Sequence, residues 1–193
     1  MIGQKQKAIV ALLLSFAVAA PGSPEVWQHF SSSRHFSVTF PTDWFRFGVS
    51  TDRLQIRSSK GGAEAVLIKR DQAEITVVEA EGSSTKTLTQ VIDYYTKGTS
   101  ILSRTTVSNE SSKQGCGKIE EVISKESVIP PGDALVSVPY IINTELFCEI
   151  DGHKIVTVLR NWEDDSRQED YQNVALQMAR SIRLARGKPG PRV

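Results

Sequence analysis

The stretch HFSVTFPTDW, residues 35–44, decides how the fold of this chain begins. Phe36, Val38 and Phe40 alternate with hydroxyl residues, so one face of the predicted strand is apolar and the other is polar. Pro41 cannot donate a hydrogen bond to a neighbouring strand, so the strand is expected to end or turn there. The stretch therefore predicts a half-buried strand followed by a corner, and it contains no catalytic motif.

Aromatic residues near the ends of predicted strands are the candidate binding residues. Trp44, Phe45 and Phe47 follow the corner, and Trp162 follows the last predicted strand. Aromatic side chains at strand ends can form a binding surface as readily as they cover a core, and core packing is the default interpretation. Because the three side chains beyond the corner cannot all point inward on one extended run, Phe45 is expected to be the exposed one.

Periodicity along the rest of the chain predicts short strands interrupted by one helix and closed by another. The expected strands are 27–30, 53–57, 63–69, 73–80, 101–108, 118–128, 135–150 and 153–160, and the expected helices are 87–97 and 167–183, the latter ending near Leu184. Whether 63–69 and 73–80 are two strands or one irregular strand is left open. Short turns between strands predict one mainly antiparallel sheet over residues 27–162, with about six or more strands and helices packed on it. The fold class is therefore α+β.

Both predicted helices carry start signals. Thr87 and Gln90 have the spacing of a capping box, and Gly98 sits where a left-handed C-cap is wanted. Ser166 and Glu169 suggest a second capping box. Apolar residues at helical spacing are expected to pack each helix on the sheet: Leu88, Val91, Ile92 and Tyr95 in the first, Tyr171, Val174, Met178 and Ile182 in the second.

The N-terminus has the pattern of a secretory signal peptide. Lys5 and Lys7 precede an apolar run over residues 8–18, which is shorter than a membrane span, and small residues place the cleavage after Ala19. An uncleaved membrane anchor is the alternative. We therefore expect an exported protein, periplasmic or secreted, with no transmembrane segment after cleavage.

The mature chain is expected to consist of one domain. Residues 20–26 are interpreted as a linker, 27–184 as a single domain and 185–193 as a disordered tail. Without the two leader lysines, 21 basic residues face 22 acidic ones, a net charge of −1. Near-neutral charge argues against a nucleic-acid partner.

The only two cysteines, Cys116 and Cys148, are expected to form one disulfide because export places them in an oxidising compartment. If they face each other across a hairpin, paired positions add to 264 and Gly132 lies at the turn, so that Val122 faces Ile142. That register is acceptable if both sheet faces are covered. The alternative is a bulge at Gly115 or Gly117 that gives an odd sum.

No catalytic, phosphate-binding or dinucleotide motif is present in the sequence. The three histidines, His29, His35 and His153, are expected to face solvent. The acidic run 163–165 with Glu169 and Asp170 is a possible calcium site, but its position favours interaction with a helix N-terminus. We expect no cofactor and no metal; two cysteines without a paired motif make a zinc site improbable.

Taken together, these features resemble the PsbP-like family, whose fold is shared with Mog-type proteins. The resemblance rests on residues 36–41 followed by Trp44, on the helix start at Thr87, on the strand after Gly117, and on the closing sequence RSIRL at 180–184. It spans about residues 27–184. It implies a central antiparallel sheet with helices on both faces, and no catalytic residues.

The resemblance also implies a function. Known roles of the family are docking roles, so we expect a bacterial exported member that acts as a non-catalytic interaction or scaffold domain and binds a protein partner in the cell envelope. Basic docking residues and a lipidation cysteine are missing, so a photosystem role is not implied. The alternative is a small secreted hydrolase, or a carrier of an apolar ligand, whose site is not visible in sequence.

Overall fold

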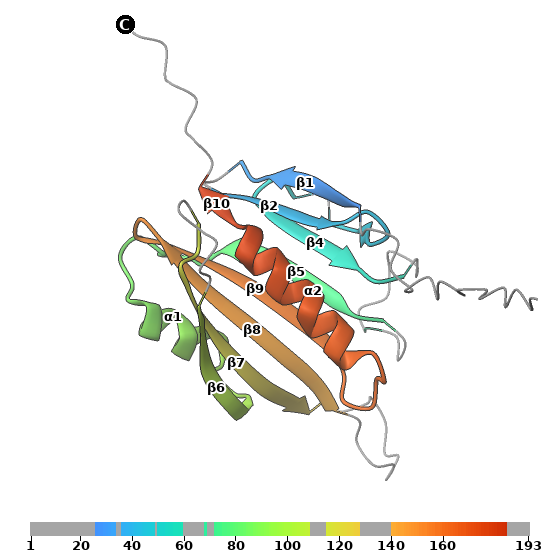
Figure 1. The fold of residues 1–193 in the computed structure, drawn as a ribbon. Helices are drawn as coiled ribbons and strands as arrows, with labels where there is room; N and C mark the ends of the chain where they lie inside the picture. The colour runs from blue at the N-terminus through green and yellow to red at the C-terminus, as the bar shows by residue number, and fades with distance from the viewer. Residues whose placement is uncertain are drawn as a thin grey trace, which may run out of the picture.

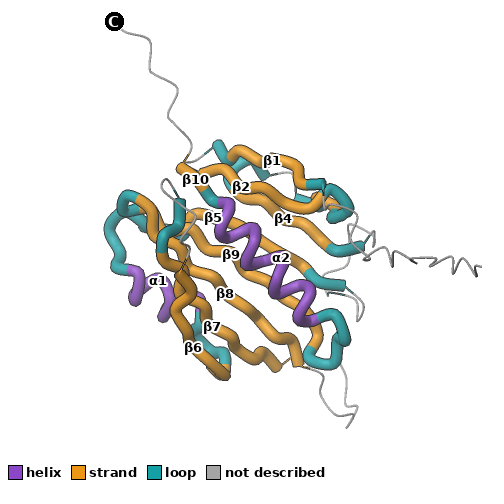
Figure 2. The backbone as a smooth tube through the Cα atoms, viewed as in Figure 1, coloured by secondary structure: helices purple, strands orange, loops and turns teal. Residues whose placement is uncertain are grey.

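The computed structural model describes residues 26–33, 36–48, 50–59, 68, 72–108, 115–127 and 140–184. Within these ranges the chain forms two helices and ten strands (Figures 1 and 2). The strands are β1 (Trp27–Ser31), β2 (Phe36–Pro41), β3 (Phe45–Arg46), β4 (Arg53–Arg57), β5 (Glu74–Glu79), β6 (Ser100–Ser108), β7 (Lys118–Ser127), β8 (Tyr140–Ile150), β9 (His153–Trp162) and β10 (Arg183–Leu184). The helices are α1 (Leu88–Tyr95) and α2 (Gln168–Ser181). The expected α+β class is confirmed.

The strands form two antiparallel sheets, where the sequence predicted one. Seven strands lie in the order β3-β4-β5-β9-β8-β7-β6, and β1-β2-β10 form a separate sheet. The expectation of a single sheet over residues 27–162 was wrong because the chain turns at residues 42–44, directly after Pro41, and β3 then pairs with β4. The second sheet takes its third strand from the far end of the chain, since β10 pairs with β2.

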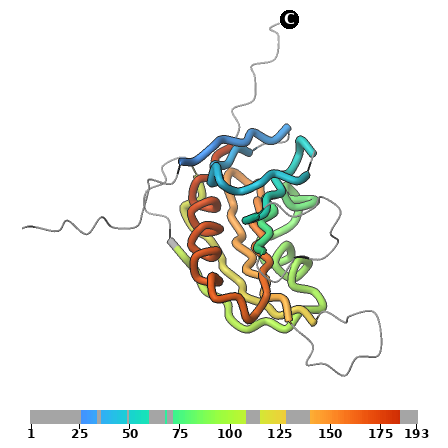
Figure 3. The backbone as a smooth tube through the Cα atoms, turned by 90° about the vertical axis from the view of Figure 1, so that its right-hand side faces the viewer, coloured from blue at the N-terminus to red at the C-terminus, as the bar shows by residue number. Residues whose placement is uncertain are grey.

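Both faces of the seven-stranded sheet are covered, as the resemblance implied. Helix α2 packs against β8 and β9 on one face and also contacts β2, while α1 lies on the opposite face next to β8. Figure 3 shows the two helices on opposite sides of the sheet.

The main core lies between α2 and the two sheets. Phe36, Val38 and Phe40 all point into it, as their alternation predicts, and they meet residues such as Leu146 and Met178. A smaller apolar cluster lies under α1 and consists of Ala80, Val91, Ile92, Val122, Phe147 and Val156.

The two helix starts differ from each other. At α1 the predicted capping box is confirmed: the Gln90 N–H donates to Thr87 Oγ1 (3.2 Å), and the Thr87 N–H donates to Gln90 Oε1 (2.8 Å). Gly98 has a φ of +82°, which favours glycine, two residues after the C-cap Thr96.

At α2 the predicted capping box was wrong. The N-cap is Arg167, whose backbone N–H donates to Asp165 Oδ1 (2.9 Å). The helix also ends at Ser181, before the predicted Leu184, because residues 183–184 are extended and pair with β2. The predicted packing is confirmed for Tyr171, Met178 and Ile182, which are buried, whereas Val174 is only partly buried.

The β7–β8 hairpin has the odd register that the sequence left as the alternative. Ile119 lies opposite Cys148, so paired positions add to 267, and Val122 faces Glu145 instead of Ile142. The 264 register was therefore wrong. Cys116 lies before β7, past Gly117, and Gly115 forms an isolated bridge with Arg183.

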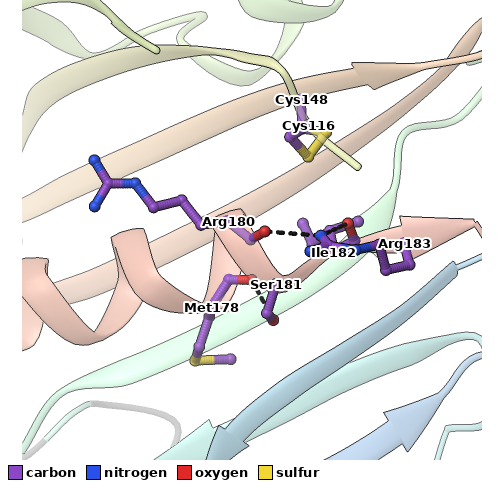
Figure 4. Close-up of a disulfide and its surroundings, with 7 residues drawn as sticks. All are labelled: Cys116, Cys148, Met178, Arg180, Ser181, Ile182 and Arg183. Carbon is purple, nitrogen blue, oxygen red and sulfur yellow. Dashed lines mark hydrogen bonds between the residues drawn. A yellow bond between two sulfur atoms is a disulfide. The ribbon is translucent and has the colours of Figure 1, made fainter. Parts of the chain in front are cut away.

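The predicted disulfide between Cys116 and Cys148 is present, with 5.5 Å between the Cα atoms. Figure 4 shows it beside the C-terminal end of α2, where Arg183 Nη1 donates to the Arg180 carbonyl (2.9 Å). Several sequence-based predictions lie outside the described residues: the signal peptide, most of the linker, the strand 63–69 apart from Ile68, the turn about Gly132, and the tail.

Candidate functional site

A cleft of about 410 Å³ lies where the N-terminal half of α2 faces the β2–β3 corner and the end of β4. Its walls are formed by Asp43, Trp44, Ser58, Arg167, Asp170, Tyr171, Asn173, Val174 and Gln177. The corner that follows β2 supplies the first two, and five residues of α2, between positions 170 and 177, form the opposite wall. Six of the nine side chains are polar or charged, so the cleft is suited to a polar ligand.

Two aromatic residues form the inner wall of the cleft. Trp44 and Tyr171 meet edge to face, with ring centroids 5.9 Å apart and planes at 89°. Both are almost fully buried, with 7% and 4% of their surface exposed. This arrangement is favourable for an aromatic pair, and it joins the β2–β3 corner to α2.

The hydroxyl of Tyr171 is buried and has no hydrogen-bond partner among the described residues. Burial raises the pKa of this phenol above its ordinary value, although Ser58 and Arg167 lie close enough to oppose the shift. The group is therefore neutral at physiological pH and can both donate and accept a hydrogen bond. A buried polar group without a partner is costly, and this one belongs to a residue that lines the cleft.

The charges of the cleft are of two kinds. Arg167 is engaged within the protein: its guanidinium lies 5.0 Å from the centre of the Tyr171 ring, and its Nε is 4.0 Å from Asp165 Oδ1. Asp43 and Asp170 are exposed on opposite walls, and neither makes a hydrogen bond or an ion pair in the described part of the chain. The uncompensated charge of the cleft is therefore negative.

The structure does not bring the four aromatic candidates into one surface. Trp44 lines the cleft, whereas Phe45 lies in β3 opposite Arg57 of β4 and is not among the lining residues. Phe45 was expected to be the exposed aromatic, and this was wrong: it is partly buried, as Phe47 is. The Arg57 guanidinium lies 4.1 Å from the centre of the Phe47 ring. Trp162 is buried beside Ile68 and Ile141, and its Nε1 donates to the Ile68 carbonyl (2.8 Å). A binding role for these residues stays a prediction.

The histidines are dispersed. His29 is exposed in the edge strand β1, where its Nε2 lies 3.0 Å from the Ser31 hydroxyl. His153 was expected to face solvent, but it is partly buried and its Nδ1 lies 2.8 Å from Glu79 Oε1. The expectation was wrong for His153 because β9 pairs with β5 in the sheet, which places His153 next to Glu79 at the end of β5. His35 lies outside the described residues.

A smaller cleft of about 280 Å³ lies near His153 and is lined by Asp52, Val78, Glu79, Glu81, Tyr94 and Tyr95. Its most buried carboxylate, Glu79, is already bound by His153 and by the Ser83 hydroxyl, which donates to it at 2.6 Å. Burial is also the main reason why the pKa of Tyr95 is raised. This cleft therefore lacks the unpartnered buried group that distinguishes the larger one.

The acidic residues near α2 occupy the positions expected of a helix N-terminus. Glu169 and Asp170 lie in its first turn, and Asp165 caps the Arg167 N–H. No group of three or more potential metal ligands occurs among the described residues. The expectation that the protein binds no metal stays a prediction.

Most residues of the cleft were not predicted from the sequence. Trp44 was a candidate but its neighbour Asp43 was not, and the sequence pattern placed Tyr171 in the core and Asp170 at the helix N-terminus. Ser58 and Arg167 were not considered. No local signal identifies them as a set, because the corner and α2 lie at opposite ends of the domain sequence. The one local feature that could have suggested the cleft is Asp43, a charged residue directly before the aromatic Trp44 at the corner after β2.

No family model and no curated protein sequence matches the chain. Solved structures do. The Ran-binding protein Mog1p from Saccharomyces cerevisiae aligns with a TM-score of 0.51 at 12% identity, over 83% of this chain and 96% of that one. This likeness confirms the fold expected from the resemblance to PsbP-like and Mog-type proteins.

Two further structures are more distant. Cyanobacterial PsbP (CyanoP) from Synechocystis aligns with a TM-score of 0.40 at 14% identity, over 88% of this chain and 99% of that one. A protein from Bacteroides thetaiotaomicron aligns with a TM-score of 0.46 at 12% identity over 83% of this chain, but this chain spans only 49% of its length. Within the described residues, neither helix is long and apolar enough to cross a membrane.

Proposed function

We propose that this protein is an exported, non-catalytic interaction domain that binds a protein partner in the cell envelope. The observation that carries the proposal is the shared fold with Mog1p, a Ran-binding protein, over nearly all of the domain. A fold alone does not specify function, so the likeness supports a class of function, the binding of a protein, and does not identify the partner.

Export is supported by the disulfide together with the N-terminal pattern. Cys116 and Cys148 form a disulfide and are both fully buried in the main core. Disulfides form and persist in oxidising compartments such as the periplasm or the extracellular space. The charged and apolar segments before Ala19 have the composition of a cleaved signal peptide.

The absence of catalysis is supported by how the reactive side chains are placed. A nucleophilic site needs a nucleophile, a base oriented by a third group, and a cleft for the substrate. His29 and Ser31 are in contact, but they lie on an exposed edge strand and do not line either of the two clefts described. The described residues that line the larger cleft include no histidine and are mostly polar, which also differs from the apolar cavity that a carrier of an apolar ligand requires.

The proposal is tested with the full chain carrying a C-terminal affinity tag and expressed in its own cells. Fractionation followed by mass spectrometry should find the protein in the envelope or the medium, cleaved after Ala19. A photo-crosslinking amino acid at Gln177, inside the cleft, should then join the protein to one partner. The same amino acid at Asp93, exposed on α1, is the control and should give no cross-link.

Two results would contradict this function. Retention of an uncleaved chain in the cytoplasm would exclude export. A saturable hydrolytic activity of the purified protein, abolished by changing His29 or His153, would show that it is an enzyme.

A further inference from the structure

The larger cleft has two carboxylates that form no ion pair with a described side chain. Asp43 projects from the β2–β3 corner and Asp170 from the first turn of α2, and both are exposed. In the part of the chain that the structure describes, no cation contacts either carboxylate. Such a pair, held on two rigid walls, attracts a cation more strongly than either carboxylate alone.

The cleft also contains a polar group that calls for a ligand. Tyr171 lines the cleft and is 96% buried, and its hydroxyl has no hydrogen-bond partner in the described part of the chain. A neutral phenol oxygen accepts a hydrogen bond from an ammonium or guanidinium group. The Tyr171 ring already holds one guanidinium, that of Arg167, at 5.0 Å, which shows that this aromatic surface tolerates a cation.

An anionic ligand fits these walls less well. Among the described residues that line the cleft, Arg167 is the only cation, and it is already engaged with Tyr171 and Asp165. An acidic ligand would therefore approach Asp43 and Asp170 without a free counter-charge. The amides of Asn173 and Gln177 add neutral hydrogen-bonding capacity at the rim.

We propose that this cleft binds a lysine or arginine side chain of a protein partner, with Asp43 and Asp170 as counter-charges and the Tyr171 hydroxyl as a hydrogen-bond acceptor. The inference rests on the proposed function, because it names the chemistry by which the partner is recognised. The partner then presents a basic segment to the start of α2, and the neighbouring Trp44 ring closes the inner end of the site.

The experiment uses the full chain as purified and a fluorescein-labelled peptide of alternating glycine and arginine as the probe. Fluorescence anisotropy at low salt should show saturable binding, while the matching peptide of glycine and glutamate should not bind. Asp43→Asn combined with Asp170→Asn should weaken binding about tenfold. Raising the salt concentration should weaken wild-type binding more than that of the double variant.

A matched control separates the cleft from general attraction of a polycation. Asp93→Asn combined with Asp151→Asn makes the same change in net charge at exposed sites on α1 and on the β8–β9 turn. It should leave the affinity within about twofold, in the range of a weak surface effect. Equal losses in the two double variants would show that binding is non-specific and would overturn the proposal.

A third variant tests the hydroxyl. Tyr171→Phe should weaken peptide binding about threefold while keeping or raising the melting temperature, because it removes a buried hydroxyl that lacks a partner. A merely structural role for the hydroxyl would instead lower the melting temperature and leave the affinity unchanged.

The remaining outcomes are also decisive. If the arginine peptide does not bind at millimolar concentration, the proposal is overturned. It is also overturned if the protein binds Ca²⁺ or Mg²⁺ but not the peptide, because the carboxylates would then form a metal site. If the cross-linked partner described above is found but Asp43→Asn with Asp170→Asn leaves its capture intact, the proposed function stands and this inference fails. If no partner is found while the peptide binds as expected, the proposed function fails instead.

Discussion

Glu145 is a carboxylic acid held at the centre of the seven-stranded sheet. It lies on β8, opposite Val122 of β7 and Val158 of β9, and only 3% of its surface is exposed. The Ser124 hydroxyl lies 3.3 and 3.4 Å from its two carboxylate oxygens. Burial raises the pKa of Glu145 to about 7, and the hydrogen bond from Ser124 opposes this shift.

This pKa predicts how stability varies with pH. The folded protein holds the Glu145 proton up to about pH 7, whereas the unfolded chain releases it near the ordinary value of 4.5. Between these values the folded state binds more protons, so the contribution of Glu145 to stability is fully present below pH 4.5 and is lost as the pH rises through 7.

Glu145→Gln should remove this dependence. Because the amide cannot ionise, we expect the variant to be more stable than the wild type by about 3 kcal/mol at pH 8, with little advantage at pH 4.5. Urea unfolding across this range measures the difference. Glu121→Gln, a change at a partly exposed site on the neighbouring strand, is the control and should keep the wild-type pH dependence. A parallel pH profile for Glu145→Gln and the wild type would contradict the prediction.

Helix α2, taken as a single element, has one face that packs on the sheets and another that lines the cleft. Tyr171, Ala175, Met178 and Ala179 are buried against the sheets at helical spacing. Residues 173, 174 and 177 turn toward the cleft. Val174 lies between the two faces, which explains why it is only partly buried. Its helical spacing from Tyr171 and Met178 had predicted full burial in the core.

The buried face predicts where a charge is least tolerated. Ala175→Asp should lower the free energy of unfolding by several kcal/mol, because Ala175 is fully buried and no cation is available to pair with the new carboxylate among its core neighbours. Asn173→Asp introduces the same side chain on the exposed face of this helix and should change stability by less than about 0.5 kcal/mol. Thermal unfolding followed by circular dichroism compares them. Similar melting temperatures for the two variants would mean that α2 does not pack as described.

At the scale of the whole molecule, the disulfide joins the segment before β7 to β8, two segments that are 32 positions apart in the sequence. Cys148 lies inside β8, whereas Cys116 precedes β7, next to the bridge from Gly115 to Arg183 in β10. Both cysteines are fully buried beside the end of α2 (Figure 4). The bond therefore fixes the larger sheet to the segment where α2 leads into the smaller one.

Replacing both cysteines by alanine should cost about 3–4 kcal/mol on the chain-entropy model for a loop of this length. The cysteines are separated by 32 positions in the sequence. Urea unfolding with and without a reducing agent measures the effect, since reduction should destabilise the wild type and leave the double variant unchanged. Free thiols at both positions, found by mass spectrometry under non-reducing conditions, would rule out the bond in the purified protein.

The sequence by itself determined the features that depend on residues close together in the chain, and the disulfide, for which only one pairing is possible. The alternation of Phe36, Val38 and Phe40 specified a half-buried strand, because side chains of an extended chain point to opposite faces in turn. Thr87 and Gln90 specified the start of α1, because both capping hydrogen bonds lie within one helical turn. The disulfide followed from there being only two cysteines.

Only the tertiary structure decided which distant segments meet. Backbone pairing is possible in several registers, so the shift between Ile119 and Cys148 and the separate sheet formed by β2 with β10 depend on how the whole core packs. The cleft arises for the same reason: the corner after β2 and the start of α2 become neighbours when Trp44 packs on Tyr171. No local pattern in either segment encodes that contact, because its stability comes from burying both side chains together.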